Sequence, residues 1–150
     1  MKAVVQRVGS ARVLTNEGHC HKINKGMVIL VGITHGDEKE DVDWLVRKIL
    51  GLRIFDDEAG VMNLNLEQVG GELMVVSQFT LHARTKKGNR PSYVDAAGPD
   101  KAIPLYEYFL EEISRLSGQV VAHGVFGAHM RVELMNDGPV TLIIDTDNKI

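Results

Sequence analysis

Three side chains that form hydrogen bonds interrupt an apolar run in the middle of the chain. The run begins at Leu73 and continues as Met-Val-Val before Ser77, Gln78, Phe79 and Thr80. In a β-strand successive side chains point to opposite faces, so polar groups would face both ways at this strand end. Hydroxyl and amide groups so placed suit either a functional site or a strand end whose side chains satisfy local backbone groups. The residues alone leave both interpretations open.

A second motif, Asn136-Asp137-Gly138-Pro139, has the composition of a turn and separates two β-like stretches, 130–134 and 140–145. Proline has no N–H and cannot donate to a sheet ladder, so Pro139 marks the edge of a sheet. An X-Pro bond is the only peptide bond with an appreciable cis population, but the sequence does not assign the isomer. We predict a turn that joins the two stretches.

The segment His19-Cys20-His21 would place two imidazoles on one face of a strand, about 7 Å apart. A metal site needs three or four convergent ligands, and no third ligand lies nearby in the sequence. The pattern therefore favours solvent-exposed histidines over a metal site. The flanking histidines could activate Cys20 as a nucleophile, but the favoured interpretation is a buried side chain on the face opposite the histidines.

The segment from Arg84 to Arg90 carries four cationic side chains in seven residues. The whole chain has 17 Lys and Arg against 20 Asp and Glu, a formal charge of −3, so no general field attracts polyanions. Any contact with nucleic-acid phosphates must then be local. The surrounding residues, 82–100, are polar and contain Gly and Pro, which predicts a long loop. A solvated loop accounts for the charge equally well.

Apolar periodicity supplies the elements that must position these residues. Strands are predicted at 3–14 with a bend or bulge at Gly9-Ser10, at 26–33 as a central buried strand, and at 53–55, 73–81, 120–126, 130–134 and 140–145. One helix is predicted after an Asp37-Glu40 capping box, with Gly51 as its C′ residue. A second runs from about 101 to 116, with Pro104 in its first turn. This order lacks βαβ alternation and predicts an α+β domain.

The longest uninterrupted apolar stretch, around 26–33, is far shorter than the ~20 residues that a membrane helix requires. The first residues, 1–7, do not have the pattern of a signal peptide, and a single cysteine suits a reducing compartment. We expect a cytoplasmic protein without a membrane partner.

Taken together, the sequence resembles the D-aminoacyl-tRNA deacylase family, also called D-tyrosyl-tRNA deacylase. The resemblance covers essentially the whole chain, and its segments are Val4–Val8, Lys48–Phe55, Val76–Leu81, Lys87–Tyr93, Gly124–Ala128 and Asn136–Thr141. The Ser-Gln-Phe-Thr-Leu and Asn-Asp-Gly-Pro-Val-Thr strings are the most specific. His129 departs from the family pattern, in which an Asp is usual.

The resemblance implies hydrolysis of the ester that joins a D-amino acid to the terminal adenosine of tRNA, with glycine mischarged on tRNA as a further substrate. It implies one domain over residues 1–150, an α+β fold whose mostly antiparallel or mixed sheet has a barrel-like arrangement, and two main helices. It also implies a homodimer with active sites at the subunit interface, the aminoacylated 3′ end of tRNA as partner, and neither metal nor cofactor.

The resemblance places the pocket chemistry on four successive residues, Ser77, Gln78, Phe79 and Thr80. It assigns Gly138-Pro139 to a cis Gly-Pro motif that enters the pocket of the other subunit, where its backbone excludes L side chains. Arg7 corresponds to a position that holds this segment, and Phe126 to a pocket residue near the substrate adenosine.

No acid, base or histidine lies inside either motif, so a hydroxyl nucleophile lacks an activating base. Attack by Thr80 therefore ranks second to a substrate-assisted route, in which the neighbouring ribose hydroxyl activates water and backbone N–H groups around Phe79 and Thr80 stabilise the oxyanion. A non-catalytic RNA-binding module that uses the 84–90 loop is the alternative. A metal-dependent hydrolase built on His19 and His21 is a third hypothesis.

Overall fold

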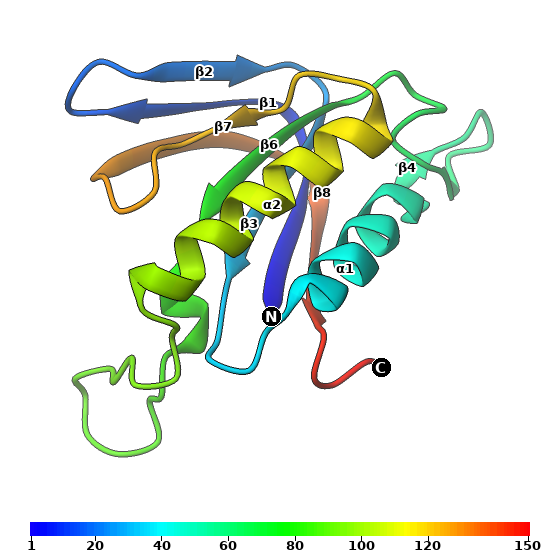
Figure 1. Ribbon diagram of the computed structural model, residues 1–150. Helices are drawn as coiled ribbons and strands as arrows, with labels where there is room; N and C mark the ends of the chain where they lie inside the picture. The colour runs from blue at the N-terminus through cyan, green and yellow to red at the C-terminus, as the bar shows by residue number, and fades with distance from the viewer.

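The apolar alternation at the start of the chain forms β1 (Lys2–Thr15), which pairs with three other strands in the computed structural model of residues 1–150 (Figure 1). The other strands are β2 (Cys20–Ile23), β3 (Gly26–Gly32), β4 (Phe55–Asp56), β5 (Met62–Leu64), β6 (Glu72–Ser77), β7 (Ala122–His123) and β8 (Met130–Asp145). The helices are α1 (Lys39–Gly51), α2 (Pro99–Ser117) and the 3₁₀ helix η1 (Phe79–His82).

The main sheet has the order β2-β1-β3-β6-β7, and β8 pairs with β1. The pairs β3/β6 and β6/β7 are parallel, whereas β1 is antiparallel to β2, β3 and β8. The sheet is mixed and nearly closes into a barrel, so the predicted α+β class and barrel-like arrangement are confirmed. The central position predicted for 26–33 is also confirmed, since β3 lies between β1 and β6.

Two apolar clusters occupy opposite faces of β3. Met27, Ile29 and Val31 belong to the larger cluster, which the apolar faces of α1 and α2 complete. Val28 belongs to the smaller one, which lies among β1, β2, β6 and β7. Figure 1 shows the two helices side by side over the sheet. None of the helices is both long enough and apolar enough to span a bilayer.

The predicted turn at residues 136–139 is wrong, because 130–145 form one continuous strand, β8. Along β1, Gln6 pairs with Thr141 and Val8 pairs with Asn136, so the single residue Arg7 lies opposite residues 137–140. The motif is therefore a bulge in a long ladder. The predicted irregularity at Gly9-Ser10 is confirmed, because a second register shift falls between Val8 and Ser10.

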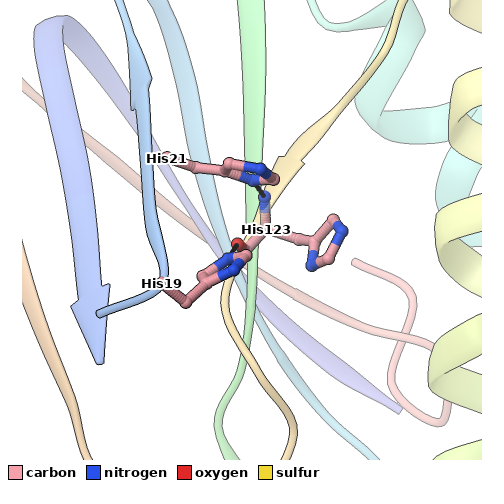
Figure 2. A group of neighbouring side chains, drawn as sticks. All are labelled: His19, His21 and His123. Atoms are coloured by element: carbon pink, nitrogen blue, oxygen red, sulfur yellow. Dashed lines mark hydrogen bonds between the residues drawn. The ribbon is translucent and has the colours of Figure 1, made fainter. Parts of the chain in front are cut away.

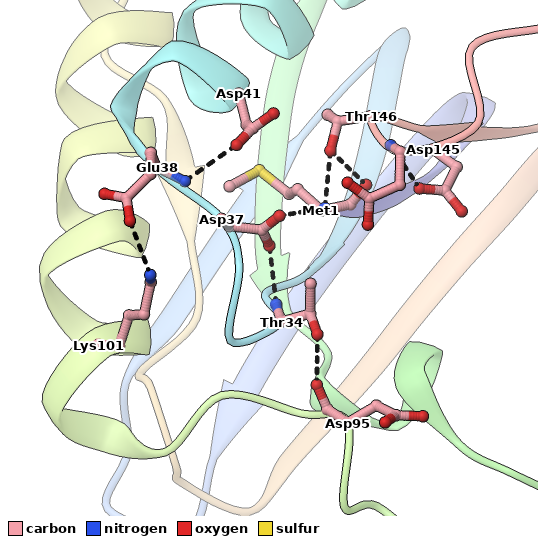
Figure 3. Close-up of polar contacts among 10 residues, drawn as sticks. Met1, Thr34, Asp37, Glu38, Asp41, Asp95, Lys101, Asp145 and Thr146 are labelled. Atoms are coloured by element: carbon pink, nitrogen blue, oxygen red, sulfur yellow. Dashed lines mark hydrogen bonds and ion pairs between the residues drawn. The ribbon is translucent and has the colours of Figure 1, made fainter.

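The α1 cap begins one residue later than predicted. Glu38 is the N-cap, and its capping-box partner is Asp41 instead of Glu40. The carboxylate of Asp37 instead accepts hydrogen bonds from the α-amine of Met1 and the Thr34 N–H, as Figure 3 shows. This buried ion pair takes Asp37 out of the cap. At the other end, Gly51 is the last helical residue and not the C′ residue.

The helix α2 begins at Pro99, earlier than predicted, so Pro104 lies inside the helix and beyond its first turn. Its side chain is exposed, and the carbonyl that its missing N–H leaves free is close to the helix start. The predicted strand at 120–126 is reduced to the two residues of β7.

The predicted strand at 73–81 ends at Ser77, and the chain turns into η1. Gly32 of β3 makes this turn possible, because a Cβ at that position would lie 2.8 Å from the carbonyl oxygen of Gln78. A side chain there would push η1 away from the sheet.

Candidate active site

A cleft of about 280 Å³ opens at the carboxyl end of β6. Ser77, Gln78 and Phe79 line one side of it, and Phe126 lies in the loop that lines the other. Its remaining lining is mostly apolar and includes residues of β3 and α2. The structure thus brings four of the predicted site residues together.

Thr80 does not line this cleft. Its hydroxyl accepts a hydrogen bond of 2.5 Å from the side-chain amide of Gln78, and no carboxylate or imidazole is hydrogen-bonded to it. The hydroxyl of Thr80 therefore has no base as a hydrogen-bond partner. As the first two residues of η1, Phe79 and Thr80 have amide N–H groups without an acceptor inside that helix. These N–H groups lie at the start of η1, next to residues that line the cleft.

Two aromatic contacts shape the walls of the cleft. The exposed ring of Phe79 meets Tyr93 edge-on, with centroids 5.0 Å apart. The ring of Phe126 lies 5.8 Å from that of Tyr106, whose hydroxyl donates to the Val75 carbonyl oxygen. Burial raises the pKa of Tyr106, so its hydroxyl remains a donor. Neither tyrosine was predicted as a site residue, although Tyr93 stands in a segment that carries the resemblance.

Arg7 fastens the bulge of β8 to the rest of the sheet. Its guanidinium is buried and donates to the carbonyl oxygens of Asp137 and Ile54, both at 2.8 Å, and to the Asp56 carboxylate at 3.1 Å. The side-chain amide of Asn136 donates back to the Arg7 carbonyl oxygen at 3.0 Å. The segment after Asn136 is thereby held at its base.

Gly138 and Pro139 stand on this bulge, joined by a cis peptide bond, and both are exposed. A Cβ on Gly138 would lie 2.3 Å from the Val140 nitrogen, so only glycine fits there without a shift of the main chain. Neither residue lines the cleft at the end of β6. The predicted site residues therefore fall into two separate groups within one chain.

The 84–90 loop projects from the body of the molecule (Figure 1). Arg84 is neutralised by Asp95, with hydrogen bonds of 2.5 and 2.6 Å, and the hydrogen bond from Arg84 holds the pKa of Asp95 below its usual range. Lys86, Lys87 and Arg90 are exposed and form no ion pair. Three cations thus remain available to a polyanion.

Both favoured interpretations of the segment 19–21 are wrong. His19 and His21 are half-buried rather than solvent-exposed, and His123 joins them as a third imidazole that the sequence reasoning missed. Cys20 is exposed rather than buried. None of the three histidines lines the cleft.

These features define an α+β protein with a nearly closed mixed sheet, a cleft large enough for a small acyl group, and an exposed cationic loop. The chain belongs to the family described as D-Tyr-tRNA(Tyr) deacylase, whose family model matches residues 4–145.

Similar proteins agree with this assignment. A D-aminoacyl-tRNA deacylase of Bacteroides thetaiotaomicron is 59% identical over 150 residues, and one of Flavobacterium psychrophilum is 54% identical over 149 residues; each match covers 99% of both chains. Among solved structures, the c-Myc DNA unwinding element binding protein has a TM-score of 0.89 and 38% identity, covering 97% of this chain and 98% of that one. A probable eukaryotic D-amino acid tRNA deacylase shares the fold, with a TM-score of 0.83 at 16% identity over 95% of this chain and 97% of that one.

Proposed function

We propose that this chain hydrolyses the ester bond of D-aminoacyl-tRNA, releasing the free D-amino acid and tRNA in the cytoplasm, where aminoacylated tRNA is found. The observation that carries this proposal is the cleft at the end of β6, which gathers Ser77, Gln78, Phe79 and Phe126 in a chain of the deacylase family. A volume of about 280 Å³, just below the usual range for small-molecule pockets, suits the aminoacyl group.

The reaction proceeds by attack of water on the ester carbonyl carbon. The resulting oxyanion accepts hydrogen bonds from the main-chain N–H groups of Phe79 and Thr80, which have no acceptor inside η1. The bond from the carbonyl carbon to the ribose oxygen then breaks, and that oxygen takes up the proton that the water lost. Since no base is hydrogen-bonded to Thr80, the neighbouring ribose hydroxyl of the substrate activates the water and relays this proton to the leaving oxygen.

Selection for D-amino acids comes from the main chain of a second copy. Gly138 and Pro139 are exposed, are held at their base by Arg7, and lie outside the cleft of their own chain. In a homodimer this segment enters the partner's cleft, and the exposed apolar side chains of Met135 and Ile143 on β8 offer a surface for that contact.

A wall of main chain rejects L-amino acids by collision, because the backbone cannot rotate away as a side chain does. The substrate amino group binds the carbonyl oxygens of Gly138 and Pro139, which directs an L side chain into the wall and a D side chain away from it. Glycine has no side chain and is accepted. The site does not read the D side chain, so many D-amino acids are substrates.

The exposed cations of the loop, Lys86, Lys87 and Arg90, contact phosphates at the acceptor end of tRNA. The edge-on pair of Phe79 and Tyr93 lies between this loop and the cleft. The same cations and rings favour a second candidate, a non-catalytic module that binds single-stranded RNA ends.

The test measures hydrolysis of D-tyrosyl-tRNA and L-tyrosyl-tRNA side by side at low enzyme concentration with a chelator present. We expect rapid cleavage of the D ester alone. If tRNA binds but neither ester is cleaved, the binding module replaces the deacylase. If activity disappears with the chelator while the melting temperature is unchanged, and returns with added metal, the metal-free route above is wrong.

Two further measurements separate the routes. Thr80→Ala keeps most of the turnover if the substrate hydroxyl activates water, and loses it if Thr80 is the nucleophile. A D-aminoacyl-tRNA that lacks the neighbouring ribose hydroxyl is cleaved poorly on the proposed route, and its normal cleavage would rule that route out.

A further inference from the structure

Three imidazoles meet at the seam where the barrel closes. The strands β2 and β7 are the two ends of the sheet order, and they lie against each other without a backbone ladder. Figure 2 shows that His19, in the turn before β2, and His21, in β2, face His123 of β7. Their ring centroids are 4.5 to 5.7 Å apart, and each side chain is half-buried.

Side chains replace the missing ladder at this seam. The His123 N–H donates to Nδ1 of His21 at 3.0 Å, and the His123 carbonyl oxygen accepts from Nε2 of His19 at 2.9 Å. Both main-chain groups of His123 are thus satisfied by imidazoles of the opposite edge. The closure of the barrel depends here on residues 102 and 104 positions away in the sequence.

Two of the three rings are already in the state that metal ligands adopt. A carbonyl oxygen can only accept, so His19 carries its proton on Nε2 and keeps the Nδ1 lone pair free. His123 likewise donates from Nδ1 to the Gly124 carbonyl oxygen at 2.7 Å and keeps Nε2 free. A ligating histidine typically donates its other N–H to a carbonyl oxygen in this way.

His21 contributes the third lone pair, which in this structure accepts the His123 N–H, so metal binding would exchange that hydrogen bond for a bond to the ion. One ring nitrogen from each histidine lies within 4.8 Å of the others. Zn–N bonds of about 2.0 to 2.1 Å in a tetrahedron would bring them to about 3.4 Å, a small inward movement of the side chains.

We propose that His19, His21 and His123 bind one Zn²⁺ ion, with water as the fourth ligand, and that this ion clamps β2 to β7. Three neutral imidazoles are a ligand set that zinc accepts. Cys20, the next residue to His21 in β2, points to the opposite face of the strand and is exposed. It is not part of the site.

The role of the ion is structural. None of the three histidines lines the cleft at the end of β6. His123 does, however, directly precede Gly124 and the loop that carries Phe126 into the cleft wall. The clamp therefore fixes the start of that loop, and hydrolysis itself does not pass through the metal.

The test is calorimetric titration of ZnCl₂ into chelator-treated protein. We expect one ion per chain and a melting temperature that rises with Zn²⁺. His21→Gln retains an acceptor for the His123 N–H and should still fold, yet it should weaken binding at least about tenfold, as should His123→Ala. His35→Ala removes an exposed histidine outside the cluster and should bind as the parent does.

Co²⁺ loaded in place of Zn²⁺ reports the geometry, and the parent should show the visible absorption of a tetrahedral ion. The proposal is overturned if the folded parent binds no Zn²⁺, if His21→Gln binds as tightly as the parent, or if Cys20→Ser abolishes binding. Because the readouts are binding and melting temperature, they are independent of the outcome of the hydrolysis assay.

Discussion

Replacement of Arg7 by methionine should loosen the β8 bulge while the rest of the fold is kept. Methionine has a similar length and avoids a large cavity, but it removes two hydrogen bonds to carbonyl oxygens and the contact with Asp56. A hydrogen bond from a charged donor contributes about 1.5 to 3 kcal/mol. Water reaches the freed carbonyl oxygens in part, so we expect a loss of about 3 kcal/mol.

For a domain of this size that loss lowers the melting temperature by about 6 to 12 °C. On the proposed function the larger effect falls on selectivity, because the segment that bears Gly138 and Pro139 loses its anchor at Asp137. The ratio of D-tyrosyl-tRNA to L-tyrosyl-tRNA hydrolysis should fall, mainly through faster cleavage of the L ester. Both quantities are measured on the same preparation, by thermal unfolding and by the paired hydrolysis assay.

Arg12→Met is the matched control. Arg12 lies on the same strand and also forms two hydrogen bonds to β8, at Glu133, but this pair is exposed to solvent. Exposed ion pairs contribute little, so both melting temperature and selectivity should stay near those of the parent. An Arg7→Met protein that melts as expected yet keeps full selectivity would refute the link between this anchor and the chiral wall.

Three other outcomes follow from contacts in the structure. Asp37→Asn leaves the buried α-amine without its counter-charge, so stability should fall by about 3 to 5 kcal/mol in denaturant titrations, whereas no loss would show that the pair is dispensable. Gly138→Ala places a Cβ 2.3 Å from the Val140 nitrogen, so the bulge must shift and the D-to-L hydrolysis ratio should drop, with unchanged selectivity counting against the wall. The hydrogen bond from Arg84 lowers the pKa of Asp95, so the ion pair stabilises the loop fully above the unfolded pKa of Asp and is lost as pH falls through the lowered pKa. Amide exchange in the loop should therefore rise in that acidic range, and Asp95→Asn should remove this pH dependence.

The spacing of apolar residues predicted the helices and strands of the core, because the buried face of each element determines which of its residues are apolar. The apolar residues of α1 recur at helical spacing, and β3 is apolar throughout because both its faces are covered. The capping box starts one residue later than predicted because of a contact between residues far apart in the sequence. The carboxylate of Asp37 is used by a main-chain amine 36 residues away, and the next acidic residue takes the cap.

The bulge at 137–140 escaped prediction because its composition is the same in a turn and in a bulge. The choice depends on the partner strand: β1 runs for 14 residues and pairs with both halves of β8. A hairpin would have required β1 to end near Arg7. Likewise, His123 lies beside His21 only because the sheet curls until its two edge strands, β2 and β7, meet. The spacing of residues along the sequence does not predict this contact.

The strand β1 connects the two halves of the proposed site. Its Arg7 holds the base of the bulge, while the residues before it pair with β3, whose end supports the turn into η1 through Gly32. The same strand therefore pairs with the bulge and with the strand that supports the cleft of the same chain. In a homodimer the main chain of Gly138 and Pro139 from one subunit would face the cleft of the partner, and the partner's own β1 would position that cleft. Rejection of L-amino acids would then depend on both subunits.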